Sequence, residues 1–260
     1  MRSVAPLLLI ALAAFVPKLE ARSEHPETYA ALRDLMDSSR SARRQGRDLL
    51  SAEADPGWVP ALVEALFFTP RHARVELFDV LEKLTGHRYR DYYDWVRYVG
   101  SHSEIETRAG YLGWKRQLLS RIDPLYERIL FPGAPLAIRL EEVVWGGVPV
   151  GGIPALDRPR TIMGSEAKYL RRNELVLGLV LGGEARAYPL RIVSWHELVN
   201  ADVGSESIAL SFCPLGGSGI FYVARDARGA ALEFDTSGLL YRSNKLMVDR
   251  QTGTLWSNLT

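Results

Sequence analysis

The sequence predicts an α+β fold in which an α-helical segment precedes a mainly β segment built of hairpins. Up to about residue 131, apolar residues recur every three or four positions, as on one face of a helix. After residue 137, short β-prone runs alternate with glycine-containing turns. We therefore expect a helical domain, similar to a helical-repeat array, over residues 22–137 and a mainly β domain over residues 138–260.

The composition is that of an ordinary globular protein. Of the 260 residues, 47% are hydrophobic, and 32 basic residues against 31 acidic residues give a net charge of +1. A nucleic-acid-binding domain would be strongly basic, so no nucleic-acid partner is expected. The single cysteine, Cys213, excludes a disulfide within the chain.

The beginning of the chain predicts export. Arg2 is followed by an apolar run from Val4 to Val16 and then by small and polar residues, with Ala21 at a suitable cleavage position. The run is too short to cross a bilayer core of about 30 Å as a helix. Residues 1–21 are therefore expected to be a signal peptide, and the mature protein to be periplasmic or extracellular without a stable membrane span.

Several amphipathic runs make up the helical segment. In the first, Leu32, Leu35 and Met36 lie on one helical face. The pairs Asp55-Pro56 and Thr69-Pro70 mark helix boundaries. The aromatic residues at positions 92, 93, 95 and 98 are expected in the core rather than in a groove. Helical arrays commonly present binding surfaces, so a protein partner is expected to bind this half if it binds at all.

Three hairpins are expected in the β segment. The first turns at Gly182-Gly183, a favoured two-residue hairpin loop. The second turns at residues 226–229, and the third turns between Asp249 and Gly253. Two further runs are expected to be strands. Residues 207–213 end at Cys213, and residues 187–195 directly precede His196.

Four motifs of the β segment resemble one known family, and they occur in that family's order. The motifs are WGGVPVGGIPAL, LGLVLGGEARAYPLRIVSWHELVN, SFCPLGGSGIFY and TSGLLYRSNKLMVDRQTGTLWS. The stretch from about Glu141 to Thr260 is thereby similar to domain-of-unknown-function family 3179, which is found mainly in bacteria and archaea. The resemblance implies a domain of this family and brings no agreed activity with it.

Two departures from the family pattern bear on function. The family usually has a second cysteine where this chain has Gly216, so a thiol pair implied by the resemblance is missing here. Similar proteins also usually continue beyond the last motif. This chain stops soon after Ser257, so its β domain is expected to be truncated at the C-terminus.

Two side chains are candidates for chemistry. His196 is the only histidine of the β segment, and imidazole suits both acid–base catalysis and metal binding. Cys213 ends a strand and enters a glycine-rich loop, where a thiolate could act as nucleophile or metal ligand. We predict that both converge in one pocket, as catalytic residues or as ligands of a single zinc or copper ion. The alternative is that both side chains are structural.

Four more residues are predicted to contact a ligand, and these are Glu197, Ser237, Tyr241 and Arg242. Arg242 could pair with an anion, and the hydroxyls could donate hydrogen bonds. Local turn chemistry is the alternative. The predicted function is an exported soluble protein with a ligand or metal pocket around His196 and Cys213. The alternative is a non-catalytic interaction scaffold in which the motif residues hold loops together.

Overall fold

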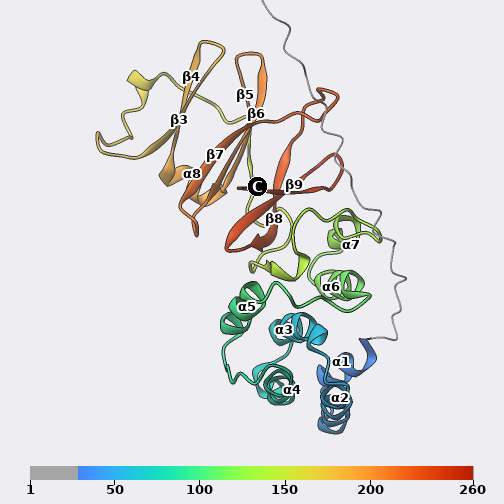
Figure 1. Cartoon of the computed structure of the whole chain (residues 1–260). Helices are drawn as coiled ribbons and strands as arrows, with labels where there is room; N and C mark the ends of the chain where they lie inside the picture. Colours follow the sequence, from blue (N-terminus) through green and yellow to red (C-terminus); the bar gives the residue numbers. More distant parts are fainter. Residues whose placement is uncertain (1–28, 260) are drawn as a thin grey trace, which may run out of the picture.

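The computed structural model describes residues 29–259, and the predicted signal peptide lies outside this range (Figure 1). Within the range, helices α1 to α7 come first and strands β1 to β10 follow, with one further helix, α8, among them. The prediction of an α+β fold built of helices and then hairpins is therefore confirmed. None of the helices in residues 29–259 has the length and apolar character that a membrane span requires.

The N-terminal helices pack around α3. They are α1 (Ala30–Leu35), α2 (Arg40–Glu53), α3 (Val59–Phe68), α4 (Val75–Thr85), α5 (Tyr92–Ser101), α6 (Tyr111–Leu119) and α7 (Leu125–Ile129), with short 3-10 turns at Pro56–Trp58, Arg71–Ala73 and Leu140–Glu142. A further 3-10 turn, Gly164–Glu166, lies between β2 and β3. Residues 59–66 of α3 are all buried, as expected for a helix that is apolar on every side except at Glu64. Helices α4, α5 and α6 contact it.

The predicted helix boundaries and aromatic core agree with the structure. The Asp55 side chain accepts a hydrogen bond from the Gly57 backbone N–H at 2.8 Å, directly before the next helical turn. Trp95 is fully buried and Tyr98 is nearly so. Tyr93 is 60% exposed, so the core prediction is wrong for this one ring.

The strands form three sheets. The inner sheet has the order β1-β8-β9-β10, the outer sheet has the order β2-β5-β6-β7, and β3 pairs with β4 alone. The bounds are β1 Val143–Trp145, β2 Leu156–Asp157, β3 Val176–Leu181, β4 Glu184–Pro189, β5 Leu198–Val203, β6 Glu206–Cys213, β7 Ser218–Val223, β8 Phe234–Tyr241, β9 Asn244–Asp249 and β10 Leu255–Ser257. The β2–β5 pair is parallel, and the other ladders of these sheets are antiparallel.

Strand β9 joins two hydrophobic clusters. Leu246 and Val248 belong to the large core that the helices share with the inner sheet. Met247 belongs to a second cluster, together with Leu198 and Ala209 of the outer sheet. Successive side chains of a strand point to opposite faces, so the inner sheet lies between the helices and the outer sheet.

Alternate side chains of β6 point to the face of the outer sheet that lies away from the inner sheet. Leu210 and Phe212 pack in a third cluster with Tyr188 of β4 and Val193 of α8 (Leu190–His196). The elements therefore stack as helices, inner sheet, outer sheet, and finally the β3–β4 hairpin with α8 (Figure 1).

Two of the three predicted hairpins are confirmed. Gly182 and Gly183 both have positive φ in the β3–β4 turn, and β9 pairs with β10 across the turn that Asp249 begins. The second predicted hairpin is correct at its turn, where the Asp226 N–H donates to the Ala230 carbonyl at 2.9 Å. Its arms do not pair further, because β7 lies in the outer sheet and β8 in the inner sheet. A bridge between Arg225 and Ala231 and a hydrogen bond from the Leu232 N–H to the Ala224 carbonyl join the two segments. Strand β8 pairs with β1 and β9 instead, which places it against the helical core.

The predicted strand over residues 187–195 is correct only as far as Pro189. Strand β4 ends at Pro189, and the chain continues as helix α8. Proline has no N–H for a β-ladder, and its fixed φ suits the residue before a helix. This change from strand to helix decides where the residues after His196 point.

Buried polar contacts join the helical half to the inner sheet. The Lys115 ammonium is fully buried and donates to the Glu64 carboxylate and to the Val143 carbonyl of β1, both at 2.5 Å. The Tyr126 hydroxyl of α7 donates to the Ser237 carbonyl of β8 at 2.7 Å. The large core thus extends across the domain boundary predicted at residues 137/138, and that boundary remains a prediction.

The ion pair between Lys115 and Glu64 gives a testable expectation. Lys115→Met leaves the Glu64 carboxylate buried without its cation, and we expect the free energy of unfolding to fall by about 3–5 kcal/mol. Urea unfolding at pH 7 measures the change. The double variant with Glu64→Leu should recover part of the loss, because it removes the uncompensated charge. A single variant as stable as the parent would contradict this role.

Candidate functional site

Glu197 is turned toward the sheets by the way in which α8 ends. It caps the helix in the left-handed region, with φ 58°, and its N–H donates to the Val193 carbonyl at 2.6 Å. A residue other than glycine adopts this conformation at a cost of roughly 1–2 kcal/mol. The Glu197 side chain is only 19% exposed. A residue with an unfavourable backbone conformation thus holds a largely buried carboxylate directly before β5.

Lys245 lies opposite this cap. It is the second residue of β9 and is 4% exposed, on the strand face that also carries Met247. Its Nζ donates a hydrogen bond to the Glu197 carbonyl oxygen and lies 3.9 Å from Oε2 of the Glu197 carboxylate. The same carbonyl accepts the Phe212 N–H of β6 at 2.8 Å. Because a buried ammonium must be hydrogen-bonded or paired, these contacts fix Lys245 between the two sheets.

Cys213 completes the group. Its side chain is buried at the end of β6, and Sγ lies 3.8 Å from the Ser243 carbonyl oxygen. Ser243 comes two residues before Lys245, so the thiol lies beside the start of β9. Next along the chain is the exposed turn of residues 214–217. The chain's single thiol therefore lies near the start of β9, the strand that carries Lys245, and directly before a turn in contact with solvent.

Burial changes the proton affinity of both charged partners. It lowers the pKa of Lys245 to about 8, although the neighbouring Glu197 and Cys213 oppose the change. Burial also raises the pKa of Glu197, and Lys245 partly offsets this. Both changes favour the neutral form, so the site can accept or release a proton near neutral pH.

Polar atoms without partners lie close by. Ser211 is on the same face of β6 as Cys213, is fully buried, and its Oγ has no hydrogen-bond partner in the described part of the chain. Ser218, opposite Cys213 in the ladder, links the amides of Asn244 and Asn258 at 3.4 and 3.2 Å. Oδ1 of Asn258 is likewise buried without a partner there. Such atoms normally bind water or a ligand.

We call this group the intersheet cluster. It consists of Glu197, Ser211, Cys213, Ser218, Asn244, Lys245 and Asn258. It combines a thiol, an amine, a carboxylate and hydroxyl and amide groups between the inner and outer sheets. These are the groups that nucleophilic and proton-transfer chemistry uses.

His196 contacts a different segment from Cys213. Its ring is half-buried, and Nδ1 lies 2.9 Å from the Pro154 carbonyl oxygen. A carbonyl only accepts, so Nδ1 carries the proton of the neutral ring and Nε2 keeps its lone pair. Zinc usually takes four ligands. Over residues 29–259 no group of three or more His, Cys, Asp or Glu side chains is arranged around a metal position.

The other predicted ligand contacts have partners within the protein. The Ser237 hydroxyl is fully buried, donates to the Leu246 carbonyl at 2.6 Å and accepts the Leu239 N–H at 3.1 Å. The Arg242 guanidinium pairs with the Glu142 carboxylate and lies 5.3 Å from the Tyr241 ring centroid. These contacts hold the β8–β9 hairpin, and ligand binding by these three residues remains a prediction.

Lys245 and Ser211 were not predicted from the sequence as site residues. Both lie inside motifs that were recognised, three residues or fewer from a glycine-rich or polar loop. One feature of the sequence could have indicated Lys245. It lies two residues before Met247 in a strand, so the two side chains share a face, and this places a charged residue on an apolar face.

The intersheet cluster lies entirely in the C-terminal part of the chain. Residues 150–260 match the DUF3179 family model. That family is described as a protein of unknown function, so the match identifies the segment and no activity. The predicted resemblance is confirmed for the DUF3179 segment, which contains every residue of the cluster. No significant match was found among curated proteins or among solved structures.

The lowered pKa of Lys245 predicts a pH dependence of stability. Between pH 8 and 10.5 the folded amine is neutral while the unfolded amine still binds a proton, so stability rises with pH. We expect the parent to gain up to about 3 kcal/mol over this range relative to Lys245→Met. Urea unfolding at several pH values measures the difference. Parallel pH curves for the two proteins would contradict the buried amine.

Proposed function

We propose that the chain is exported and that its DUF3179 segment binds and reacts with a small electrophilic ligand through the Cys213 thiol. The observation that carries the proposal is the buried Lys245 amine, which contacts Glu197 and lies beside Cys213. A cation next to a thiol favours the thiolate, which is the reactive form. The single cysteine makes this chemistry testable at one position.

Each residue has a separate role in the proposal. The Cys213 thiolate attacks the electrophilic carbon of the ligand, a new S–C bond forms, and the leaving group departs with the bond's electron pair. Lys245 stabilises the thiolate and can supply a proton to the leaving group, because its ammonium loses a proton readily at pH 8. Glu197 positions the amine through its carbonyl and balances the charge.

The rate of thiol alkylation tests these roles. Iodoacetamide should modify Cys213 in the folded parent, and Lys245→Met should slow the reaction roughly tenfold, the effect of losing about 1.4 kcal/mol of thiolate stabilisation. Lys245→Arg should keep most of the rate, since it keeps a cation. Lys168→Met, which removes an exposed lysine, is the matched control and should react like the parent.

Two results would overturn the proposal. The first is an alkylation rate that follows the urea unfolding curve. It would show that Cys213 reacts only in the unfolded protein and that the thiol is structural. Equal rates for the parent and Lys245→Met would remove the lysine from the chemistry. Either outcome favours the scaffold, in which the DUF3179 segment and the helices serve interaction alone.

Metal binding by His196 and Cys213 is the other use of the same residues. Metal content of protein purified without chelators separates the two cases, with Cys213→Ser and His196→Ala as variants. About one equivalent of zinc or copper in the parent, lost from both variants, would replace the reacting thiol with a metal site. The thiol proposal expects no such equivalent.

Export has its own test. We expect cleavage after Ala21 when the full sequence is expressed in a bacterium, since the first 21 residues have the layout of a signal peptide. N-terminal sequencing of protein from the periplasm or medium identifies the cut. Full-length protein that stays in the cytoplasm would contradict export, whatever the outcome of the alkylation test.

A further inference from the structure

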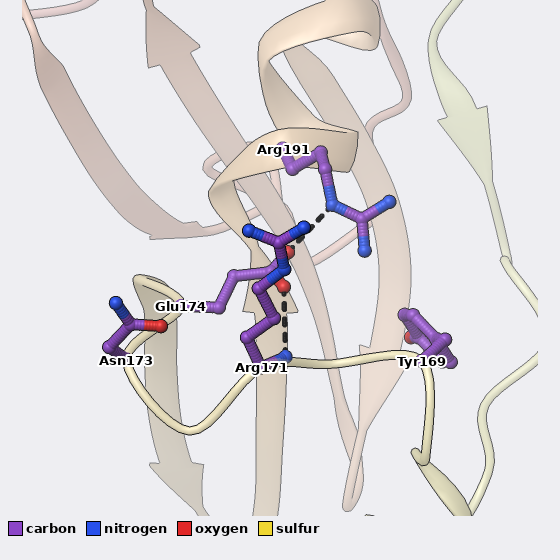
Figure 2. A pocket seen from close by; sticks show the side chains of 5 residues that line it. All are labelled: Tyr169, Arg171, Asn173, Glu174 and Arg191. Atoms are coloured by element: carbon purple, nitrogen blue, oxygen red, sulfur yellow. Dashed lines mark hydrogen bonds and ion pairs between the residues drawn. The ribbon is translucent and has the colours of Figure 1, made fainter.

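A surface hollow lies outside the intersheet cluster, between the loop that precedes β3 and helix α8. Its lining residues are Tyr169, Arg171, Asn173, Glu174 and Arg191, and its volume is about 550 Å³ (Figure 2). Small-molecule sites usually have volumes of roughly 300–1,000 Å³. The hollow is thus large enough for a ligand of one or two rings.

The hollow has more positive than negative charge. Glu174 accepts a hydrogen bond from Nε of Arg191 at 2.8 Å and one from the Arg171 backbone N–H at 3.2 Å. Both carboxylate oxygens are therefore engaged, while the two terminal amino groups of Arg191 have no hydrogen-bond partner among residues 29–259. Figure 2 shows both guanidinium groups beside this one carboxylate. Guanidinium groups so placed suit a carboxylate or phosphate.

One aromatic ring lines the hollow, and a second lies on the helix that carries Arg191. Tyr169 is 52% exposed, and its ring centroid lies 5.9 Å from the Arg191 guanidinium. Trp195 is 79% exposed and follows Arg191 by four residues on α8, which places both on one helix face. Exposed aromatic side chains next to polar groups are typical of ligand sites, where the ring contacts an apolar face of the ligand.

We propose that this hollow binds a small ring-bearing acid, either a sugar acid or a sugar phosphate. Arg171 and Arg191 hold the acidic group. Tyr169 and Trp195 contact the ring. The site uses none of the intersheet cluster's residues, so its test is independent of the test of the proposed function.

Calorimetric titration of the purified full chain with four probes tests the assignment. Glucuronate and glucose 6-phosphate represent the two acids, and glucose and inorganic phosphate represent the ring and the anion alone. We expect at least one of the two acids to bind about tenfold or more tightly than glucose and than inorganic phosphate, because each lacks one half of the contacts. Which acid binds more tightly identifies the ligand.

Variants separate the site from general surface charge. Arg171→Gln and Arg191→Gln should each weaken binding of the preferred acid roughly tenfold, and Trp195→Ala should weaken it severalfold. The matched control is Arg172→Gln, which removes the exposed arginine next to Arg171 that does not line the hollow, and it should change affinity less than about twofold.

Three results would overturn the assignment. The first is no binding of either acid. The second is an equal loss in Arg172→Gln and Arg171→Gln, which would show attraction by net charge alone. The third is inorganic phosphate binding as tightly as the preferred acid, which would remove the ring contacts. Circular dichroism of each variant confirms that the fold is kept.

Discussion

Strand β9 must satisfy two different neighbours at once, and the other layers depend on it. One face carries Leu246 and Val248 into the helical core, and the other carries Met247 toward the outer sheet. A shift of one residue in its pairing would exchange the two faces and bury the wrong set. The register of β9 against β8 and β10 therefore determines which side chains lie between the sheets, Lys245 among them.

The buried Lys245 amine in turn requires hydrogen-bond acceptors, and Glu197, between α8 and β5, provides them. The Glu197 carbonyl is available because α8 ends in a left-handed residue rather than continuing into β5. The same carbonyl receives the Phe212 N–H, so one peptide group connects α8, β6 and β9. The hydrogen bonds that hold the sheets together therefore also position the Lys245 amine.

Local signals account for what could be predicted from the sequence. A Gly182-Gly183 turn or an Asp55 cap depends on a few adjacent residues, and both were recognised. Strand order was not, because β7 and β8 separate into different sheets for reasons of tertiary packing. The site at Lys245 was missed for the same reason. Strand alternation tells which residues share a face, but the outer sheet that buries this lysine comes from residues far earlier in the chain.

The stacking order of the layers also indicates which layer unfolds first. The β3–β4 hairpin and α8 share a cluster with the outer sheet and none with the helical core, so this layer can detach while the rest stays folded. Such partial unfolding of a cooperative unit costs less free energy than global unfolding. It would withdraw Glu197 from Lys245 and expose the space between the sheets. Amide hydrogens of α8 should accordingly exchange sooner than those of α3.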